Sequence, residues 1–137
     1  MKGELTNMSY DFKDIAAFHG VMVFCEQRQG KLMPTDFELI SEARKLADEL
    51  STEVFALVIG SECQHMIKEV AGYGADKVIV CENPLLKNYT TEAYTEVIEQ
   101  VVKAYKPEIF LFGATNIGRD LAPRCAARLH TRLRIVY

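Results

Sequence analysis

Residues 21–60 read VMVFCEQRQGKLMPTDFELISEARKLADELSTEVFALVIG and carry the pattern of a β-strand, an α-helix and a second β-strand. The apolar runs 21–25 and 54–59 have the length of strands that are buried on both faces. The motif Thr35-Asp36-Phe37-Glu38 predicts a capping box in which Thr35 and Glu38 begin the helix. Behind it, apolar side chains recur every three or four residues and predict one buried face: Phe37, Ile40, Ala43, Leu46, Ala47 and Leu50.

The same alternation continues along the chain. Residues 61–64 (Ser-Glu-Cys-Gln) predict a second capping box before a short helix with three inward side chains: Ile67, Val70 and Ala71. A third strand is expected at 77–81. A third helix is expected to begin at Thr90 or Thr91 and to stop before Pro107, because the residue before a proline disfavours helical geometry. Its predicted inward stripe is Tyr94, Val97, Ile98, Val101, Val102 and Tyr105.

A fourth strand, 109–112, leads through a glycine-bounded loop into a fourth helix, 121–129. Pro123 lacks an N–H group and fits a helix best in the first turn, so Asp120 is expected to be the N-cap. Strand–helix alternation repeated four times predicts an α/β fold. We expect an open, doubly wound, mostly parallel sheet with helices on both faces.

Composition restricts the class of protein. The chain has 137 residues, of which 49% are hydrophobic and 26% charged, as expected for one globular domain with a substantial core. The net charge is −3 with both signs interspersed, which argues against a nucleic-acid partner. The four cysteines form no CxxC pair and follow no secretory leader, which indicates reduced thiols in the cytoplasm. No apolar run is long enough for membrane insertion.

The domain boundary is expected near residue 19. Residues 1–18 lack the continuous apolar segment of a signal peptide and are interpreted as an N-terminal extension, and residues 19–137 as the domain. In a doubly wound sheet, ligands bind at the carboxyl ends of the strands. That rule directs attention to the segments that follow Cys25, Gly60, Cys81 and Phe112.

One of these segments, Gly113-Ala114-Thr115-Asn116-Ile117-Gly118-Arg119-Asp120, has features of a binding loop. Its two glycines enclose four residues before a helix, close to the P-loop pattern. Asp120, however, stands where a P-loop needs Ser or Thr for magnesium, so a working P-loop is disfavoured. Two interpretations remain: a generic strand-to-helix turn, and a nucleotide or subunit contact through Thr115, Asn116 and Arg119.

The other reactive side chains predict no site. Cys63 and His65 are two residues apart and do not share a helix face, which argues against a metal site. His19 and His130 are isolated, and Cys25 and Cys81 are interpreted as small buried hydrophobic residues. No catalytic residue is expected. A row of arginines near the end of the chain indicates a solvated face or an inter-domain ion pair, with phosphate recognition as the second interpretation: Arg119, Arg124, Arg128, Arg132 and Arg134.

Four segments carry a family resemblance: Val23–Gln27, Gly30–Leu32, Gly74–Val78 and, above all, Leu111–Arg124 followed by Ala126–Leu129. Over residues 19–131 the chain resembles the N-terminal domain of electron-transfer flavoprotein alpha subunits. The resemblance implies an adenine nucleotide alpha hydrolase-like fold without a hydrolase site. It also implies an electron carrier rather than an enzyme, passing electrons between flavin dehydrogenases of the acyl-CoA type and a downstream acceptor.

The resemblance further implies a heterodimer with a beta subunit, and FAD held by a C-terminal domain whose motifs do not occur in this chain. No FAD ligand is therefore assigned, and the chain alone is expected to bind no cofactor. The loop is expected to be a structural or subunit-contact element through Gly113, Thr115, Asn116, Gly118, Arg119 and Asp120. The alternative from another class is a free-standing nucleotide-binding or stress-type regulatory domain, and a third is a purely structural interaction module.

The end of the chain departs from the family. Where the family continues Thr-Gly-Leu-Thr-Ala-Asp-Cys, residues 132–137 read RLRIVY. This departure is interpreted as a frameshift or truncation that leaves the domain incomplete at its C-terminus and without the FAD domain. In that case residues 133–137 are expected to be disordered or loosely packed at an edge. The alternative is a natural short paralogue with a fifth strand over Leu133–Tyr137.

Overall fold

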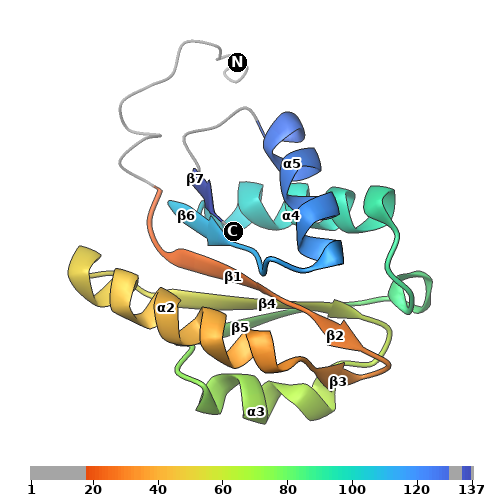
Figure 1. The fold of residues 1–137 in the computed structure, drawn as a ribbon, viewed down its shortest axis with the longest axis horizontal. Coiled ribbons are helices and arrows are strands. Elements are labelled where there is room, and N and C mark those ends of the chain that lie inside the picture. Colours follow the sequence, from red (N-terminus) through yellow and green to blue (C-terminus); the bar gives the residue numbers. More distant parts are fainter. Residues whose placement is uncertain (1–17, 130–133, 137) are drawn as a thin grey trace.

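The computed structural model describes residues 18–129 and the backbone of residues 134–136. A five-stranded sheet has the order β5-β4-β1-β6-β7, and every neighbouring pair is parallel (Figure 1). Its strands are β1 (Val21–Cys25), β4 (Val54–Gly60), β5 (Lys77–Glu82), β6 (Ile109–Leu111) and β7 (Arg134–Val136). The predicted doubly wound α/β fold is confirmed.

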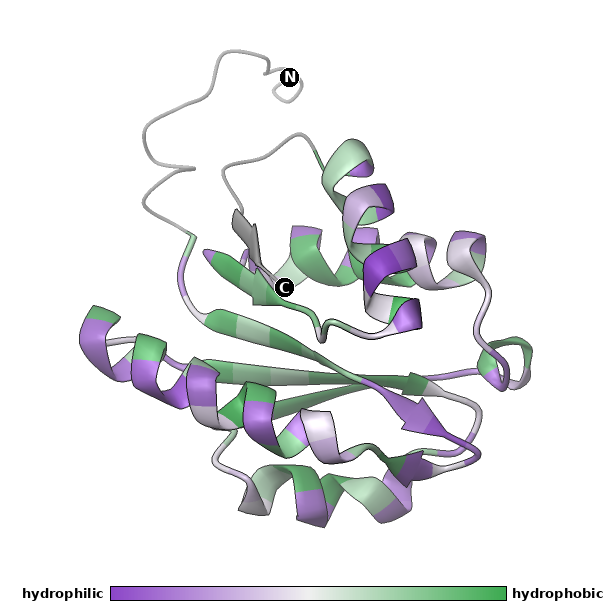
Figure 2. Cartoon of the chain, in the orientation of Figure 1, coloured by the Kyte–Doolittle hydropathy of each residue, from purple (hydrophilic) through white to green (hydrophobic). Residues whose placement is uncertain are grey.

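Helices cover both faces of this sheet. Figure 1 shows α2 (Pro34–Leu50) and α3 (Ile67–Gly72) on one face and α4 (Thr91–Tyr105) and α5 (Asn116–Arg128) on the other. Side chains alternate along the buried strands: Val23 packs toward α2, while Phe24 packs toward α4 and α5. Figure 2 shows the result, with apolar strands between helices whose outer surfaces are hydrophilic. The strands are therefore fully apolar because both of their faces are covered.

The strand order creates a topological switch point at β1. The chain proceeds from β1 to β4 and β5 on one side, and α4 then returns it to β6 on the other side of β1. Val21 is in register with both Val54 and Ile109. Connections leave the carboxyl ends of β1 and β6 in opposite directions, so a crevice opens between them.

Helix α2 begins earlier than predicted. Met33 is the N-cap, and Asp36 Oδ2 accepts a hydrogen bond from the Met33 N–H at 2.9 Å. The predicted capping box of Thr35 and Glu38 is wrong, because Pro34 fits the first helical position and the helix therefore begins closer to the N-terminus than predicted. The buried stripe is also narrower than expected. Phe37 is 52% exposed, and Leu50, at the helix end, is 43% exposed.

The segment before α3 also differs from its prediction. Residues 61–64 do not form a capping box, and the chain instead enters α3 through a 3₁₀ turn, η1 (Gln64–Met66). Glu82 on β5 supplies the acceptors: its carboxylate accepts from the Cys63 N–H at 2.7 Å and from the Gln64 side-chain amide at 3.0 Å. Val70 faces the core as predicted, whereas Ala71 is exposed. The cap of this turn thus comes from a neighbouring strand.

Two further details surround α4. Its N-cap is Thr90, as predicted, although the Thr90 side chain makes no capping hydrogen bond. The helix ends at Tyr105, and its C-cap Lys106, which has φ 50°, precedes Pro107. Most of the predicted stripe faces the core, but Tyr105 is 41% exposed. A short 3₁₀ turn, η2 (Pro84–Leu86), precedes the helix. The predicted helix end was therefore placed within two residues.

A short hairpin follows β1 and was not predicted. Strands β2 (Gln27–Arg28) and β3 (Lys31–Leu32) pair antiparallel across Gln29 and Gly30, whose φ angles are 53° and 79°. Two consecutive residues with positive φ form the tight turn that suits a two-residue hairpin, and glycine adopts it without strain. The polar segment after β1 is therefore ordered structure at the edge of the crevice.

At the other end of the domain, β7 pairs with β6 in the register Ile109↔Arg134. Of the two expectations for the tail, disorder is wrong for residues 134–136, whose backbone forms a strand as in the fifth-strand alternative, and a position at the edge of the sheet is confirmed. The expectations for residues 1–17, including most of the N-terminal extension, and for His130, Arg132, Leu133 and Tyr137 concern positions outside the described residues. Within the described ranges, no helix combines the length and apolar character needed to cross a membrane.

Candidate site at the carboxyl ends of β1 and β6

The loop after β6 turns directly into α5 at Thr115. The Thr115 Oγ1 atom accepts a hydrogen bond from the Gly118 N–H at 3.0 Å, and the Thr115 carbonyl accepts from the Arg119 N–H at 2.8 Å. Thr115 is thus the N-cap, and α5 begins at Asn116 rather than at 121. The prediction of Asp120 as N-cap is wrong. Pro123 lies inside the helix, not in its first turn.

Gly118 is required by close packing. A Cβ atom at this position would lie 1.9 Å from the carbonyl oxygen of Gly113, far closer than any real contact. Both glycines are buried. Gly118 therefore lets the end of β6 cross the first turn of α5, which explains this glycine without a phosphate, whereas a Cβ atom at Gly113 would meet no atom closer than 3.5 Å.

A buried carboxylate lies beside this turn. Thr115 Oγ1 donates a hydrogen bond of 2.5 Å to Glu26 Oε1, from the residue that directly follows β1. Glu26 is only 4% exposed, and its second oxygen, Oε2, has no hydrogen-bond partner among the described residues. Glu26 was not predicted as a site residue, because a glutamate in a polar segment after a strand is usually exposed. Thr115 thus links α5 to the carboxyl end of β1.

Asp36 extends this link to α2. Its side chain is fully buried, and Oδ1 accepts a hydrogen bond from the Glu26 N–H at 2.8 Å while Oδ2 accepts from Met33. Burial raises the pKa of Asp36 to about 7 and outweighs the two backbone hydrogen bonds, which lower it, while the Glu26 charge raises it further. Two acidic side chains are therefore enclosed at the switch point, and each is tied to a helix start.

Asp120 holds α5 against the start of α4. Its carboxylate accepts a hydrogen bond from the Tyr89 hydroxyl at 2.6 Å and a second one from the Thr91 hydroxyl. These two bonds lower the pKa of Asp120, and Tyr89, through burial and then its bond to Asp120, has a pKa raised to about 12. Asp120 joins two helices and does not cap one.

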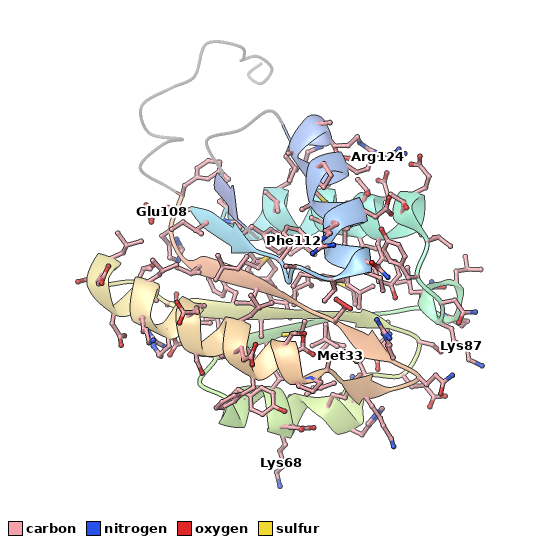
Figure 3. The ribbon with its side chains drawn as sticks, viewed as in Figure 1. Met33, Lys68, Lys87, Glu108, Phe112 and Arg124 are labelled. Carbon is pink, nitrogen blue, oxygen red and sulfur yellow. The ribbon has the colours of Figure 1, made fainter. Side chains whose placement is uncertain are left out.

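The arginines of α5 fall into two groups. Arg124 pairs with Glu92 and projects toward α4 (Figure 3), and Arg128 pairs with Glu96 at 3.0 Å and with Glu99 at 2.6 Å. Both side chains are exposed, as expected for a solvated face, and their partners lie in the same domain, so the expected inter-domain ion pair is wrong for both. Arg119 is exposed and forms no side-chain hydrogen bond or ion pair with another described residue.

The crevice itself is bordered by the hairpin. A cavity of about 280 Å³ includes Glu26, Tyr89 and Tyr94 in its lining, and an adjoining cavity of about 550 Å³ reaches His65 and Lys87. Figure 3 shows Lys87 at the same edge of the sheet as the β2–β3 hairpin. His65 Nε2 lies 2.6 Å from the Gly30 carbonyl oxygen and fixes the hairpin turn to η1.

The first turn of α5 does not fit a phosphate-bearing cofactor such as FAD. A phosphate binds at a helix N-terminus where free N–H groups and positive charge converge. Here the Gly118 N–H is used by Thr115, and the Glu26 carboxylate lies beside the turn, where it would repel a phosphate. Over the described residues, no group of three or more His, Cys, Asp or Glu side chains is placed to hold a metal ion.

Two solved structures share the architecture. A universal stress protein from Archaeoglobus fulgidus has a TM-score of 0.56 and 7% identity, covering 86% of this chain and 98% of that chain. A universal stress protein in complex with cAMP has a TM-score of 0.52 and 12% identity, covering 88% and 98%. At these identities the likeness concerns the fold alone. The class is that of compact α/β domains with a parallel sheet and a crevice at its switch point.

Sequence comparison narrows this class to one family. Residues 21–134 match the electron transfer flavoprotein domain, so the chain belongs to the electron transfer flavoprotein family, and the resemblance seen in the sequence is confirmed. The chain is 60% identical over 126 residues to the acryloyl-CoA reductase electron transfer subunit beta of Anaerotignum propionicum, covering 92% of this chain and 34% of that protein.

A second relative carries the alpha designation. The chain is 51% identical over 123 residues to the electron transfer flavoprotein subunit alpha of Thermoanaerobacterium thermosaccharolyticum, covering 90% of this chain and 36% of that protein. The chain therefore spans about a third of the length of these relatives, as an N-terminal-domain-sized piece would.

Proposed function

We propose that this chain is the flavin-free N-terminal domain of an electron-carrier subunit, of the alpha type, in the cytoplasm. The match to the electron transfer flavoprotein domain over residues 21–134 is the observation that carries the proposal. In such a carrier, the flavin accepts and releases electrons, and the protein supplies binding and orientation. The domain itself contributes a scaffold and contacts to a second subunit, and it catalyses no reaction.

The geometry of the loop after β6 supports two roles for its residues: some hold the turn, and others contact the second subunit. Of the six residues expected to form a structural or subunit-contact element, four pack inward or join two elements: Gly113, Thr115, Gly118 and Asp120. Asn116 and Arg119 are exposed on the first turn of α5. The inward residues hold the turn, and the two outward residues contact the second subunit. An exposed guanidinium with no partner among the residues that the structure describes suits a carboxylate on another chain.

Flavin binding tests the first part of the proposal. Isothermal titration of the purified 137-residue chain with FAD should show no binding in the micromolar range. The Glu26 carboxylate lies beside the first turn of α5, where a phosphate would otherwise bind. The chain should also be colourless as purified. Micromolar FAD binding by the chain alone would overturn the flavin-free role.

Association tests the second part. The chain and the second subunit of the same carrier, co-expressed and separated by size exclusion, should elute as one complex. Separate elution at micromolar concentration would reject the carrier-subunit proposal. If the complex forms, we infer that dehydrogenases of the acyl-CoA type meet this domain only through the complex.

A free-standing nucleotide-binding domain is the alternative. The observation in its favour is the cavity of about 280 Å³ at the switch point, beside a Glu26 oxygen with no partner among the described residues. A carboxylate can accept hydrogen bonds from a ribose, which would leave the phosphates toward Lys87. A colourless preparation that releases AMP or ATP on denaturation would favour this alternative, whereas release of no nucleotide would favour the carrier subunit.

A further inference from the structure

An open apolar groove runs along the β5 edge of the domain, between η2 and α4. Six apolar side chains line this β5 groove: Cys81, Leu85, Leu86, Ala93, Val97 and Val101. It forms a cavity of about 420 Å³. It lies away from the switch-point crevice, since the two cavities of that crevice share no lining residue with it. The β5 groove is thus a separate surface feature.

The groove exposes apolar surface in a defined shape. Leu85 is 83% exposed, while its neighbour Leu86 is 6% exposed and anchors η2 in the core. The Asn83 side chain accepts a hydrogen bond from the Leu85 N–H at 2.9 Å, which fixes the turn that carries Leu85. Ordered, exposed apolar surface of this kind marks a protein contact more often than it marks idle surface.

The strand beneath the groove, β5, is an edge of the sheet and pairs on one side only among the described residues. All seven residues of β4 are buried, whereas the four central residues of β5 are only half-buried. Ile79 and Cys81 face the same core cluster as Ala93 and Val97, and all four are partly exposed. The apolar surface of the groove is therefore continuous with the edge strand, and natural domains usually cover or charge such an edge.

The rim of the groove is acidic. Glu82 and Glu96 are among its lining residues. Glu96 pairs with Arg128 at 3.0 Å and accepts a hydrogen bond from Gln100 at 3.2 Å, whereas the Glu82 carboxylate accepts, among the described residues, only from uncharged donors, so its negative charge is the one left for a partner. Both glutamates are exposed. An apolar floor with an acidic rim is complementary to an amphipathic segment that carries apolar anchors flanked by Lys or Arg.

We propose that the β5 groove binds an amphipathic segment of the second subunit, with apolar side chains between Leu85 and Val97 and a basic side chain over Glu82. This assignment rests on the proposed carrier-subunit function and adds to it a contact surface separate from the loop after β6. Docking there covers the open edge of β5 and removes Leu85 from water.

The test measures the affinity of the 137-residue chain for the second subunit by isothermal titration. Leu85→Arg and Val97→Arg should each weaken binding at least about tenfold, because a charged side chain enters the apolar contact. Phe37→Arg is the matched control, since Phe37 is an exposed apolar side chain on α2, on the other face of the sheet, and should leave affinity unchanged. Thermal unfolding of each variant shows that the fold is retained.

A second pair of variants tests the sign of the rim charge. Gln100→Lys should weaken binding, and Gln100→Glu, of nearly the same shape as the native residue, should leave it unchanged or tighten it. Raising the salt concentration should reduce the difference between the two variants, because the pair acts through exposed charges.

The outcomes separate this inference from the proposed function. If the wild-type chain binds the second subunit and the groove variants bind equally well, the groove assignment fails while the carrier-subunit proposal stands. If the wild-type chain does not bind, both fail. A wild-type chain that is dimeric by light scattering, and that Leu85→Arg makes monomeric, would assign the groove to a second copy and overturn the proposal.

Discussion

Two sets of residues in the loop after β6, one buried or half-buried and one exposed, differ in what surrounds them. Gly113, Thr115 and Gly118 are packed against β1 and the first turn of α5, and their positions are fixed by a carbonyl, a hydroxyl and a buried carboxylate. Asn116 and Arg119, which directly follow Thr115 and Gly118 in the chain, are exposed. A continuous motif thus combines positions that the fold requires with positions that the fold leaves open.

The largest effect is expected at Gly118. Gly118→Ala places a Cβ atom 1.9 Å from the Gly113 carbonyl oxygen, so the loop or the helix must move. We expect a loss of about 3 kcal/mol or more in the free energy of unfolding, measured with urea. Gly72→Ala is the control, because a Cβ there meets no atom within 4 Å. Equal stability of both variants would remove the packing explanation for the loop.

The buried acid next to the loop should give the chain a pH-dependent stability. The pKa of Asp36 is about 7 in the folded chain against 3.8 for a free side chain, so the folded state binds this proton more tightly. The corresponding stabilisation is fully present below pH 3.8 and is lost as the pH rises to about 7.

Wild type should therefore lose about 2–3 kcal/mol relative to Asp36→Asn between pH 4 and pH 7. The comparison of the two slopes cancels other titrating groups, which both chains share. Parallel stability curves across this range would show that Asp36 is ionised throughout.

A smaller effect is expected at Thr115. Thr115→Val removes both the cap of α5 and the donor to Glu26, at a cost of about 1–2 kcal/mol. Thr115→Ser keeps the hydroxyl and should lose much less. Thermal unfolding of the three chains provides the measurement, and a Val variant as stable as the wild type would show that the two hydroxyl hydrogen bonds contribute nothing to stability.

The smallest change in stability is expected on the outward side. Arg119→Ala should alter the free energy of unfolding by less than about 0.5 kcal/mol, because the guanidinium has no partner within the described residues. Its affinity for the second subunit should fall about tenfold. Arg124→Ala, which breaks an exposed pair with Glu92, is the control and should keep that affinity. Unchanged affinity in both variants would leave Arg119 without a role.

The strands β1, β4, β5 and β6 were predicted from sequence almost residue by residue, while the starts of α2, α3 and α5 were not. Apolar runs such as 54–59 report burial directly, since both faces of β4 are covered. Helix starts depend on which acceptor reaches the first N–H groups, and that acceptor can be distant. Glu82 serves Cys63 from another strand, a partnership that local motifs do not reveal.

The candidate site shows the same limit. The loop 113–120 was singled out correctly as a segment of interest, but Glu26 and Asp36 were not expected beside it. Neither carboxylate has a local pattern that indicates burial, and each is enclosed only because β6 and α2 meet at the end of β1. The cap at Thr115 was missed because Pro123 favoured a later helix start, whereas the structure places that proline inside α5.

The hydrogen bond between Thr115 and Glu26 also bears on how the domain is made on the ribosome. It joins residues 89 positions apart. While the chain is being synthesised, the Glu26 carboxylate stays without this donor until residue 115 has left the exit tunnel, so the β1–α2–β4 unit cannot reach its final arrangement earlier. Contacts of such long sequence separation close late and slow folding. Completion of the domain is therefore tied to emergence of its last helix, and an N-terminal piece that ends before α5 should be a target for chaperones and proteases.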